Sequence, residues 1–278
     1  MVDFSNKKET VRTVLNFLLS FLGSVFISFT SLAVVLAVIL SKPYISYTLN
    51  SSGYITAAAS DLAEELNHLA IPSGLTDDFF NDKINTAELS RLTNEAIESN
   101  YSAKPFIPDT AALKNELINH FNNFAKGETV INLNSDNTEA LNELADMCVE
   151  KYVSFAAPSL LKYLALYSAR LFKYCLIAFA VLGFLSLFTL LFNARLNKEN
   201  KEKVRSFTFF SLCGAGFMCL IPSVILLLGK FISKVNLQPL SALSFLVSFV
   251  NGSLVLLLII GLLLLASSII RMLIKRKA

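Results

Sequence analysis

The sequence predicts an all-α membrane protein with four transmembrane helices and an extracytoplasmic helical-bundle domain inserted between spans 1 and 2. Apolar residues make up 54% of the chain and charged residues only 16%, which is an unusual composition for a soluble domain. Four stretches, residues 14–40, 174–192, 207–229 and 240–270, contain no Asp, Glu, Lys, Arg or His. About 20 helical residues cross the hydrocarbon core, so these stretches have the length of membrane spans.

The first stretch follows a short tail, residues 1–13, which carries Lys7, Lys8 and Arg12. A secretory signal peptide has a similar charged start, but its apolar region is only about 7–15 residues long. Here the uncharged run covers residues 14–40 and is followed by Ser41-Lys42-Pro43 rather than a small-x-small cleavage site. We therefore expect an uncleaved anchor, transmembrane helix 1.

The distribution of cations predicts the orientation. Residues 1–13, 193–206 and 271–278 hold twelve of the 24 Lys and Arg residues but only four acidic residues. Residues 41–173 and 230–239 hold the other twelve cations together with seventeen acidic residues. Because Lys and Arg concentrate on the cytoplasmic side, we expect both termini and the basic loop 193–206 to be cytoplasmic. The domain 41–173 and the short loop 230–239 would then lie outside.

Cysteine usage indicates the compartment. Of the four cysteines, only Cys148 lies in the domain 41–173, so that domain has no internal disulfide. An exported domain without disulfides is more typical of a bacterial plasma membrane than of a eukaryotic secretory surface. We therefore expect a multi-pass protein of a bacterial plasma membrane.

Amphipathic periodicity predicts four helices within the domain 41–173. The first covers Ser52 to Ala70 with an apolar stripe, and a short helical segment covers Asp77 to Asp82. Asn85 caps the next helix, with Glu88 at the capping-box spacing, and that helix ends near Tyr101. Two further helices begin at Asp109 and Asp136, with one short strand from Thr129 to Leu133 between them. Pro158 interrupts the last helix, which resumes at Ser159 and continues into span 2.

Both histidines follow a glutamate by four residues, as Glu64–His68 and Glu116–His120. Residues four apart share a helix face, so two such helices packed together could bring two carboxylates and two imidazoles to one cation, such as zinc. The more common role of such a pair is an interaction on the exposed surface of its own helix. Cys148 has no histidine beside it in sequence, which favours a structural role.

Motifs of other protein classes are absent from the sequence. It contains no P-loop, dinucleotide fingerprint, Gly-x-Ser-x-Gly or His-Glu-x-x-His motif, and no cofactor is indicated. The cations lie at membrane edges and the outer domain is acidic, which does not favour binding to nucleic acid. The spans contain no ionisable residue, whereas ion-coupled transporters use such residues. Small-residue stripes, such as Ser20, Ser24, Ser28 and Ser31, favour close helix packing over a substrate path.

These observations leave three functional classes. The first is a non-enzymatic sensing, binding or scaffold protein that acts through its outer domain on a protein partner in or at the membrane. The second follows from topology alone: one span, a large outer domain and three further spans resemble the arrangement of ABC permeases, which implies a cytoplasmic ATPase partner. A bacterial lipoprotein transacylase family is similar in pairing four spans with an outer domain that contains histidines. The third class is a membrane-anchored metal-dependent enzyme using Glu64, His68, Glu116 and His120.

Overall fold

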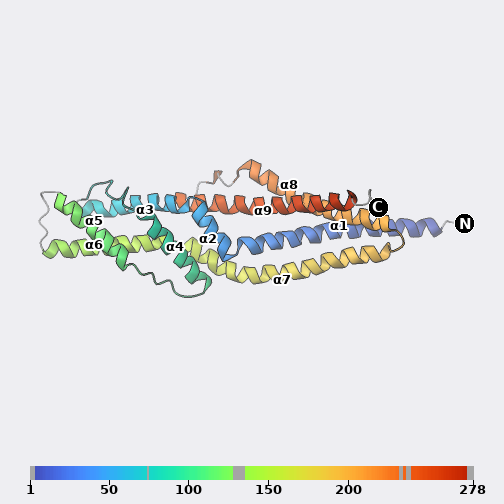
Figure 1. Cartoon of the computed structure of the whole chain (residues 1–278), viewed down its shortest axis with the longest axis horizontal. Coiled ribbons are helices and arrows are strands. Elements are labelled where there is room, and N and C mark those ends of the chain that lie inside the picture. The colour runs from blue at the N-terminus through green and yellow to red at the C-terminus, as the bar shows by residue number, and fades with distance from the viewer. Residues whose placement is uncertain (1–3, 74, 128–134, 232–233, 236–238, 274–278) are drawn as a thin grey trace. The chain divides into compact units, whose positions relative to one another are not determined.

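The computed structural model of the chain describes residues 4–73, 75–127, 135–231, 234–235 and 239–273, and every regular element in these ranges is a helix (Figure 1). The chain forms two compact units. One, here the span unit, comprises Met1–Ser41, Arg170–Lys234 and Phe249–Ala278. The other, here the α2–α6 unit, comprises Lys42–Ala169 and Val235–Ser248. The predicted all-helical class is confirmed for the described residues.

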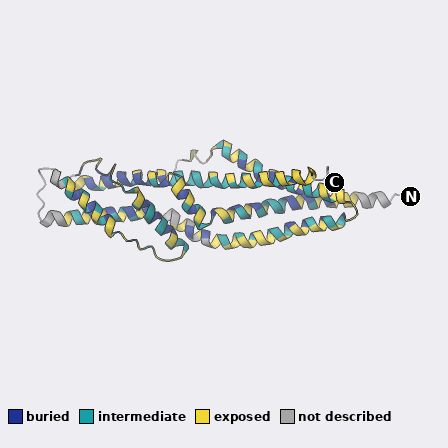
Figure 2. Ribbon diagram, in the orientation of Figure 1, coloured by how far each residue is buried: buried dark blue, intermediate teal, exposed yellow. Residues whose placement is uncertain are grey.

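Among the described residues, four helices are long and apolar enough to cross a membrane, as predicted. They are α1 (Phe4–Ile39), α7 (Ser159–Leu196), α8 (Lys201–Gly229) and α9 (Leu240–Leu273). Much of the apolar part of α7 is exposed, including Phe184 and Phe188 (Figure 2). Large apolar side chains exposed along a whole helix are expected where lipid rather than water covers the surface.

Glycines allow close contacts between helices of the span unit. A Cβ added to Gly214 of α8 would lie 2.6 Å from Ser24 Oγ on α1, which is closer than the van der Waals radii allow. A Cβ added to Gly216 would lie 3.0 Å from the carbonyl oxygen of Gly261 on α9, and one added to Gly261 would lie 3.0 Å from the Gly216 carbonyl oxygen. Helices without a hydrophobic driving force between them associate through such small-residue packing.

The α2–α6 unit is built from α2 (Lys42–Ser51), α3 (Tyr54–Ala70), the 3-10 turn η1 (Ile71–Ser73), α4 (Thr86–Tyr101), α5 (Ala111–Gly127) and α6 (Ser135–Ala156). Helix α6 contacts α3, α4 and α5, while α2 contacts α3 and α4 (Figure 1). The fully buried side chains include Leu62, Leu66, Phe80, Leu89, Leu92, Ile97, Leu113, Phe121 and Tyr152. Most come from the predicted apolar stripes, and Phe80 comes from the turn segment before α4. Helix α6 differs from its predicted stripe, since Met147 is exposed and Tyr152 is buried instead.

The helix starts show which predicted caps form. Asn85 caps α4, since its side chain accepts from the Glu88 N–H at 3.0 Å. The reciprocal half of the capping box does not form, because the Asn85 N–H donates to the Tyr152 hydroxyl at 3.2 Å. The Glu88 carboxylate instead pairs with Arg91, and this hydrogen bond lowers the pKa of Glu88. Asp109 accepts from the Ala111 N–H at 3.2 Å at the start of α5.

Three local expectations have different outcomes. Helix α2 is absent from the predicted elements, although Pro43 at its second position is compatible with a helix start. Residues 77–83 form consecutive turns rather than the expected helical segment from Asp77 to Asp82. The expected strand from Thr129 to Leu133 lies outside the described residues.

The long helices pass from one unit to the other. Helix α7 is continuous from Ser159 to Leu196, as predicted from the sequence after Pro158, and so it begins in the α2–α6 unit and ends in the span unit. Helix α9, predicted to span the membrane over residues 240–270, is a candidate span from Leu240 to Leu273, and its first nine residues, 240–248, group with the α2–α6 unit. The 25 residues from Phe249 to Leu273 still give about 37 Å of helix at 1.5 Å per residue, which exceeds the hydrocarbon thickness.

Candidate functional site: a polar cleft on helix α3

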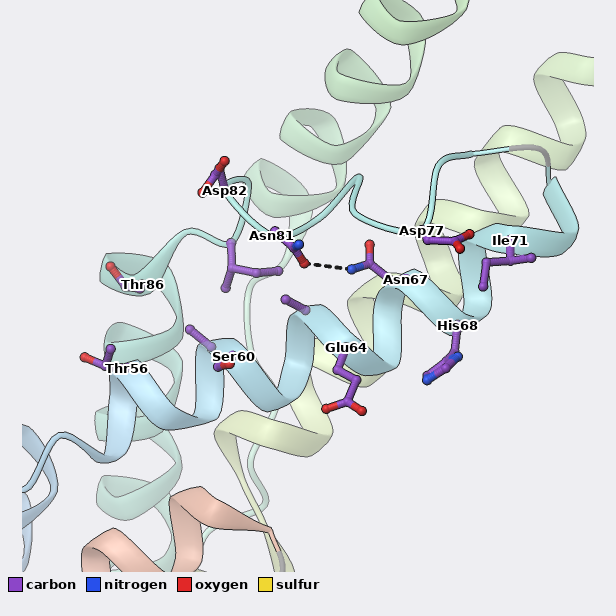
Figure 3. A pocket seen from close by; sticks show the side chains of 13 residues that line it. Thr56, Ser60, Glu64, Asn67, His68, Ile71, Asp77, Asn81, Asp82 and Thr86 are labelled. Carbon is purple, nitrogen blue, oxygen red and sulfur yellow. Dashed lines mark hydrogen bonds between the residues drawn. The ribbon is translucent and has the colours of Figure 1, made fainter.

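One face of α3 carries polar side chains in a helical repeat. Thr56, Ser60, Glu64 and His68 follow one another at intervals of four residues, so they lie along one side of the helix (Figure 3). All four are exposed. The opposite side of α3 is buried, which fixes the rotation of the helix and directs the polar stripe outward.

A buried amide attaches the second wall of the cleft to α3. Asn67 is only 7% exposed, and its Nδ2 donates to Asn81 Oδ1 at 2.9 Å (Figure 3). Its Oδ1 accepts from the Phe80 N–H, also at 2.9 Å. Because these bonds satisfy the amide on both sides, they hold the turn segment 77–83 beside α3.

Aromatic packing supports the same segment from within. The Phe79 and Phe80 rings are buried and both contact the Phe121 ring of α5. Lys83 places its ammonium 3.4 Å from the centre of the Phe79 ring and donates to the Phe79 carbonyl at 2.9 Å. Burial lowers the pKa of Lys83, while the charges of Asp78 and Asp82 oppose that shift. The segment is therefore anchored on both of its faces.

The two walls enclose a cleft of about 720 Å³. Its ionisable lining consists of three carboxylates, those of Glu64, Asp77 and Asp82, and one imidazole, that of His68. The hydroxyls of Thr56, Ser60 and Thr86 and the amides of Asn67 and Asn81 complete the polar lining. A cleft with this excess of carboxylates attracts cations and offers acceptors to hydroxyl and amino groups.

The structure separates the two predicted Glu–His pairs. Glu64 and His68 line the cleft on α3. On α5, Glu116 Oε1 lies 3.9 Å from His120 Nε2, and the Glu116 carboxylate accepts from Asn85 Nδ2 at 3.2 Å. Among the described residues, no group of three or more His, Cys, Asp or Glu side chains could hold a metal ion. The four residues therefore do not form one site, and metal binding by either pair stays a prediction.

Cys148 lies inside the α2–α6 unit, with none of its surface exposed. Burial raises the pKa of its thiol to about 12, so the reactive thiolate is scarce at neutral pH. The geometry agrees with the structural role favoured by its sequence context.

The start of α9 docks on α3, a contact that sequence reasoning did not identify. The Ser241 N–H donates to Asp61 Oδ2 at 3.1 Å. The Phe245 ring is 1% exposed and packs edge-on against the Tyr54 ring, with the ring centres 6.4 Å apart. The Tyr54 hydroxyl in turn donates to the Phe155 carbonyl of α6 at 3.2 Å. A carboxylate at a helix N-terminus satisfies a free N–H and complements the helix dipole.

Comparison with protein-family models, with curated proteins and with solved structures finds no match to this chain. The candidate sites therefore rest on the geometry of the chain itself.

Proposed function

We propose that this chain is a non-enzymatic sensing protein of the plasma membrane, with its α2–α6 unit on the extracytoplasmic side. In this proposal the cleft on α3 binds a small cationic ligand, and the bound state is passed to a protein partner in or at the membrane. The dense basic charge of residues 1–13, 193–206 and 271–278 supports the orientation, with both termini in the cytoplasm.

The docking of α9 on α3 carries the proposal. Asp61, which receives the first turn of α9, lies directly beside Ser60 and one turn before Glu64, both of which line the cleft. A ligand that moves or neutralises this part of α3 changes the environment of Asp61. Because α9 is one continuous helix from Leu240 to Leu273, a displaced first turn alters its membrane-spanning part. Such coupling requires that the ligand prefer one of two arrangements of the helix pair.

The chemistry of the cleft supports a cationic ligand. Its three carboxylates exceed its one imidazole, and its hydroxyl and amide groups can bind donors on a polar molecule. A volume of about 720 Å³ falls in the range of small-molecule sites. The exposed lining allows entry from solvent without opening of the unit.

Partner recovery from membranes tests the proposal with a matched pair of variants. The full chain is solubilised in mild detergent, and co-purifying proteins are quantified by mass spectrometry for the wild type, Glu64→Gln and Glu65→Gln. Glu65 is the next residue of α3, but it faces away from the cleft and pairs with Lys151 of α6 at 2.9 Å. We expect a partner whose recovery changes with Glu64→Gln but not with Glu65→Gln. Recovery of no protein beyond that seen with an unrelated four-span protein would contradict the proposal.

A further inference from the structure

Buried polar side chains of α1, α7 and α8 lie close together in the span unit. We call this set the polar seam, and every member is less than a tenth exposed: Asn16, Ser20 and Ser24 in α1, Thr189 and Asn193 in α7, Asn197 directly after α7, and Ser211 in α8. None of these groups carries a formal charge. A buried polar group is costly without a hydrogen-bond partner, so each of them needs one.

Three contacts establish an antiparallel register between α1 and α7. Asn16 and Asn197 bond reciprocally through their amides, at 3.0 and 2.8 Å. Further along, a Cβ added to Gly23 would lie 3.6 Å from Thr189 Oγ1. Beyond that, Thr30 Oγ1 lies 3.4 Å from Ser186 Oγ. Ser20 lies between the first two contacts on α1, and Asn193 lies between them on α7, so these two residues occupy the same level.

Ser20 differs from the other hydroxyl residues of α1. Ser24, Ser28 and Ser31 each donate to the carbonyl four residues earlier, at 3.0, 2.9 and 2.9 Å. Ser20 Oγ is buried and has no hydrogen-bond partner among the described residues. Its backbone carbonyl, in contrast, accepts from the hydroxyls of both Ser24 and Ser211, each at 3.0 Å.

A buried hydroxyl left unpaired costs about 1–3 kcal/mol. An ordered water removes that cost where two to four polar groups surround it. The Asn193 amide lies at the level of Ser20 on α7, and Asn16 lies one turn before Ser20 on α1. Small residues alone would indicate only close packing, whereas the unpaired Ser20 hydroxyl indicates a ligand.

We propose that the polar seam holds an internal water at Ser20, between α1 and α7. The ligand is neutral water rather than an ion, because none of the seven side chains of the polar seam carries a charge to balance an ion. The water bridges Ser20 Oγ to the neighbouring seam groups and joins the two helices. The inference is independent of the function proposed for the cleft.

Water-edited solid-state NMR of the unmodified full chain in lipid vesicles tests the proposal. This experiment follows magnetisation from water protons into assigned serine signals. Ser223 of α8 is the internal control, because it is fully buried and its hydroxyl donates to the Cys219 carbonyl at 2.8 Å. We expect the Ser20 signal to build up at short mixing times, before that of Ser223. Equal build-up at the two serines, whether fast or slow, would overturn the proposal, and a slow signal at both would mean that Ser20 uses a backbone carbonyl instead.

Discussion

Replacement of Asp61 by Ala should loosen the first turn of α9 without unfolding the rest of the chain. Asp61 Oδ2 accepts from the N–H of Ser241, the second residue of α9, and the first four N–H groups of a helix have no partner within it. A hydrogen bond to a charged group and the helix-dipole interaction together contribute about 1–2 kcal/mol. That free energy corresponds to an opening equilibrium about 5- to 30-fold larger.

Hydrogen exchange of the full chain in detergent, followed by mass spectrometry, measures this opening. We expect peptides covering Ser241 to Phe245 to exchange about 5- to 30-fold faster in Asp61→Ala. Asp61→Asn keeps an acceptor but loses the charge, so its effect should be smaller, about 2- to 5-fold. Glu65→Ala is the matched control, since it removes an ion pair to α6 from the same helix. Unchanged exchange in Asp61→Ala, or equal acceleration in Glu65→Ala, would refute the docking argument.

Three further predictions concern stability. Ala103 has a φ of 53° at the end of α4, where glycine is preferred, so Ala103→Gly should raise the free energy of unfolding by about 0.5–1 kcal/mol, and an unchanged urea midpoint would contradict this. Gly214→Ala should lower the thermal midpoint through its clash with Ser24, at a cost of about 1–3 kcal/mol, whereas Gly183→Ala meets no atom within 4 Å and should not lower it. Burial raises the pKa of the Cys148 thiol from 9.0 to about 12. The stability contributed by the buried neutral thiol is therefore full below pH 9 and is lost between pH 9 and pH 12. In that range the free energy of unfolding should fall by up to about 1.4 kcal/mol per pH unit. Urea unfolding across this range should show a smaller loss in Cys148→Ala.

The sequence predicted the features that depend on residues within one helix, such as the apolar spans and a helix cap. The four charge-free stretches locate the apolar helices because charge is excluded from the hydrocarbon core. Charge does not end a helix, however, and α1 begins at Phe4, before Lys7, Lys8 and Arg12. Asn85 caps α4 as expected, because its cap bond is local. Helix α2, in contrast, was not predicted, because a proline usually indicates a break in a helix. Pro43 lies at the second position of α2, where a helix tolerates proline.

The candidate sites depend on contacts between elements, and for that reason only part of them was predictable. Glu64 and His68 are recognisable from their spacing on α3, but Asp77 and Asp82 reach the cleft because Asn67 bonds to the turn segment. In this bond the Phe80 N–H donates to Asn67 Oδ1. The Phe80 N–H is therefore satisfied without a helical hydrogen bond. The docking of residues 240–248 is hidden in an apolar run that continues unbroken into the span. Within residues 240–248, only the serines distinguish the sequence from that of the span that follows.

The position of the α2–α6 unit relative to the membrane is the central claim, and labelling of intact cells tests it most directly. The four native cysteines are first replaced by serine. One cysteine is then introduced either at Ser102, exposed after α4, or at Lys198, exposed in the basic loop between α7 and α8, and cells are treated with a membrane-impermeant maleimide. We expect Ser102→Cys to be labelled in intact cells and Lys198→Cys to be labelled only after permeabilisation. Labelling of Lys198→Cys in intact cells, with Ser102→Cys protected until permeabilisation, would contradict it.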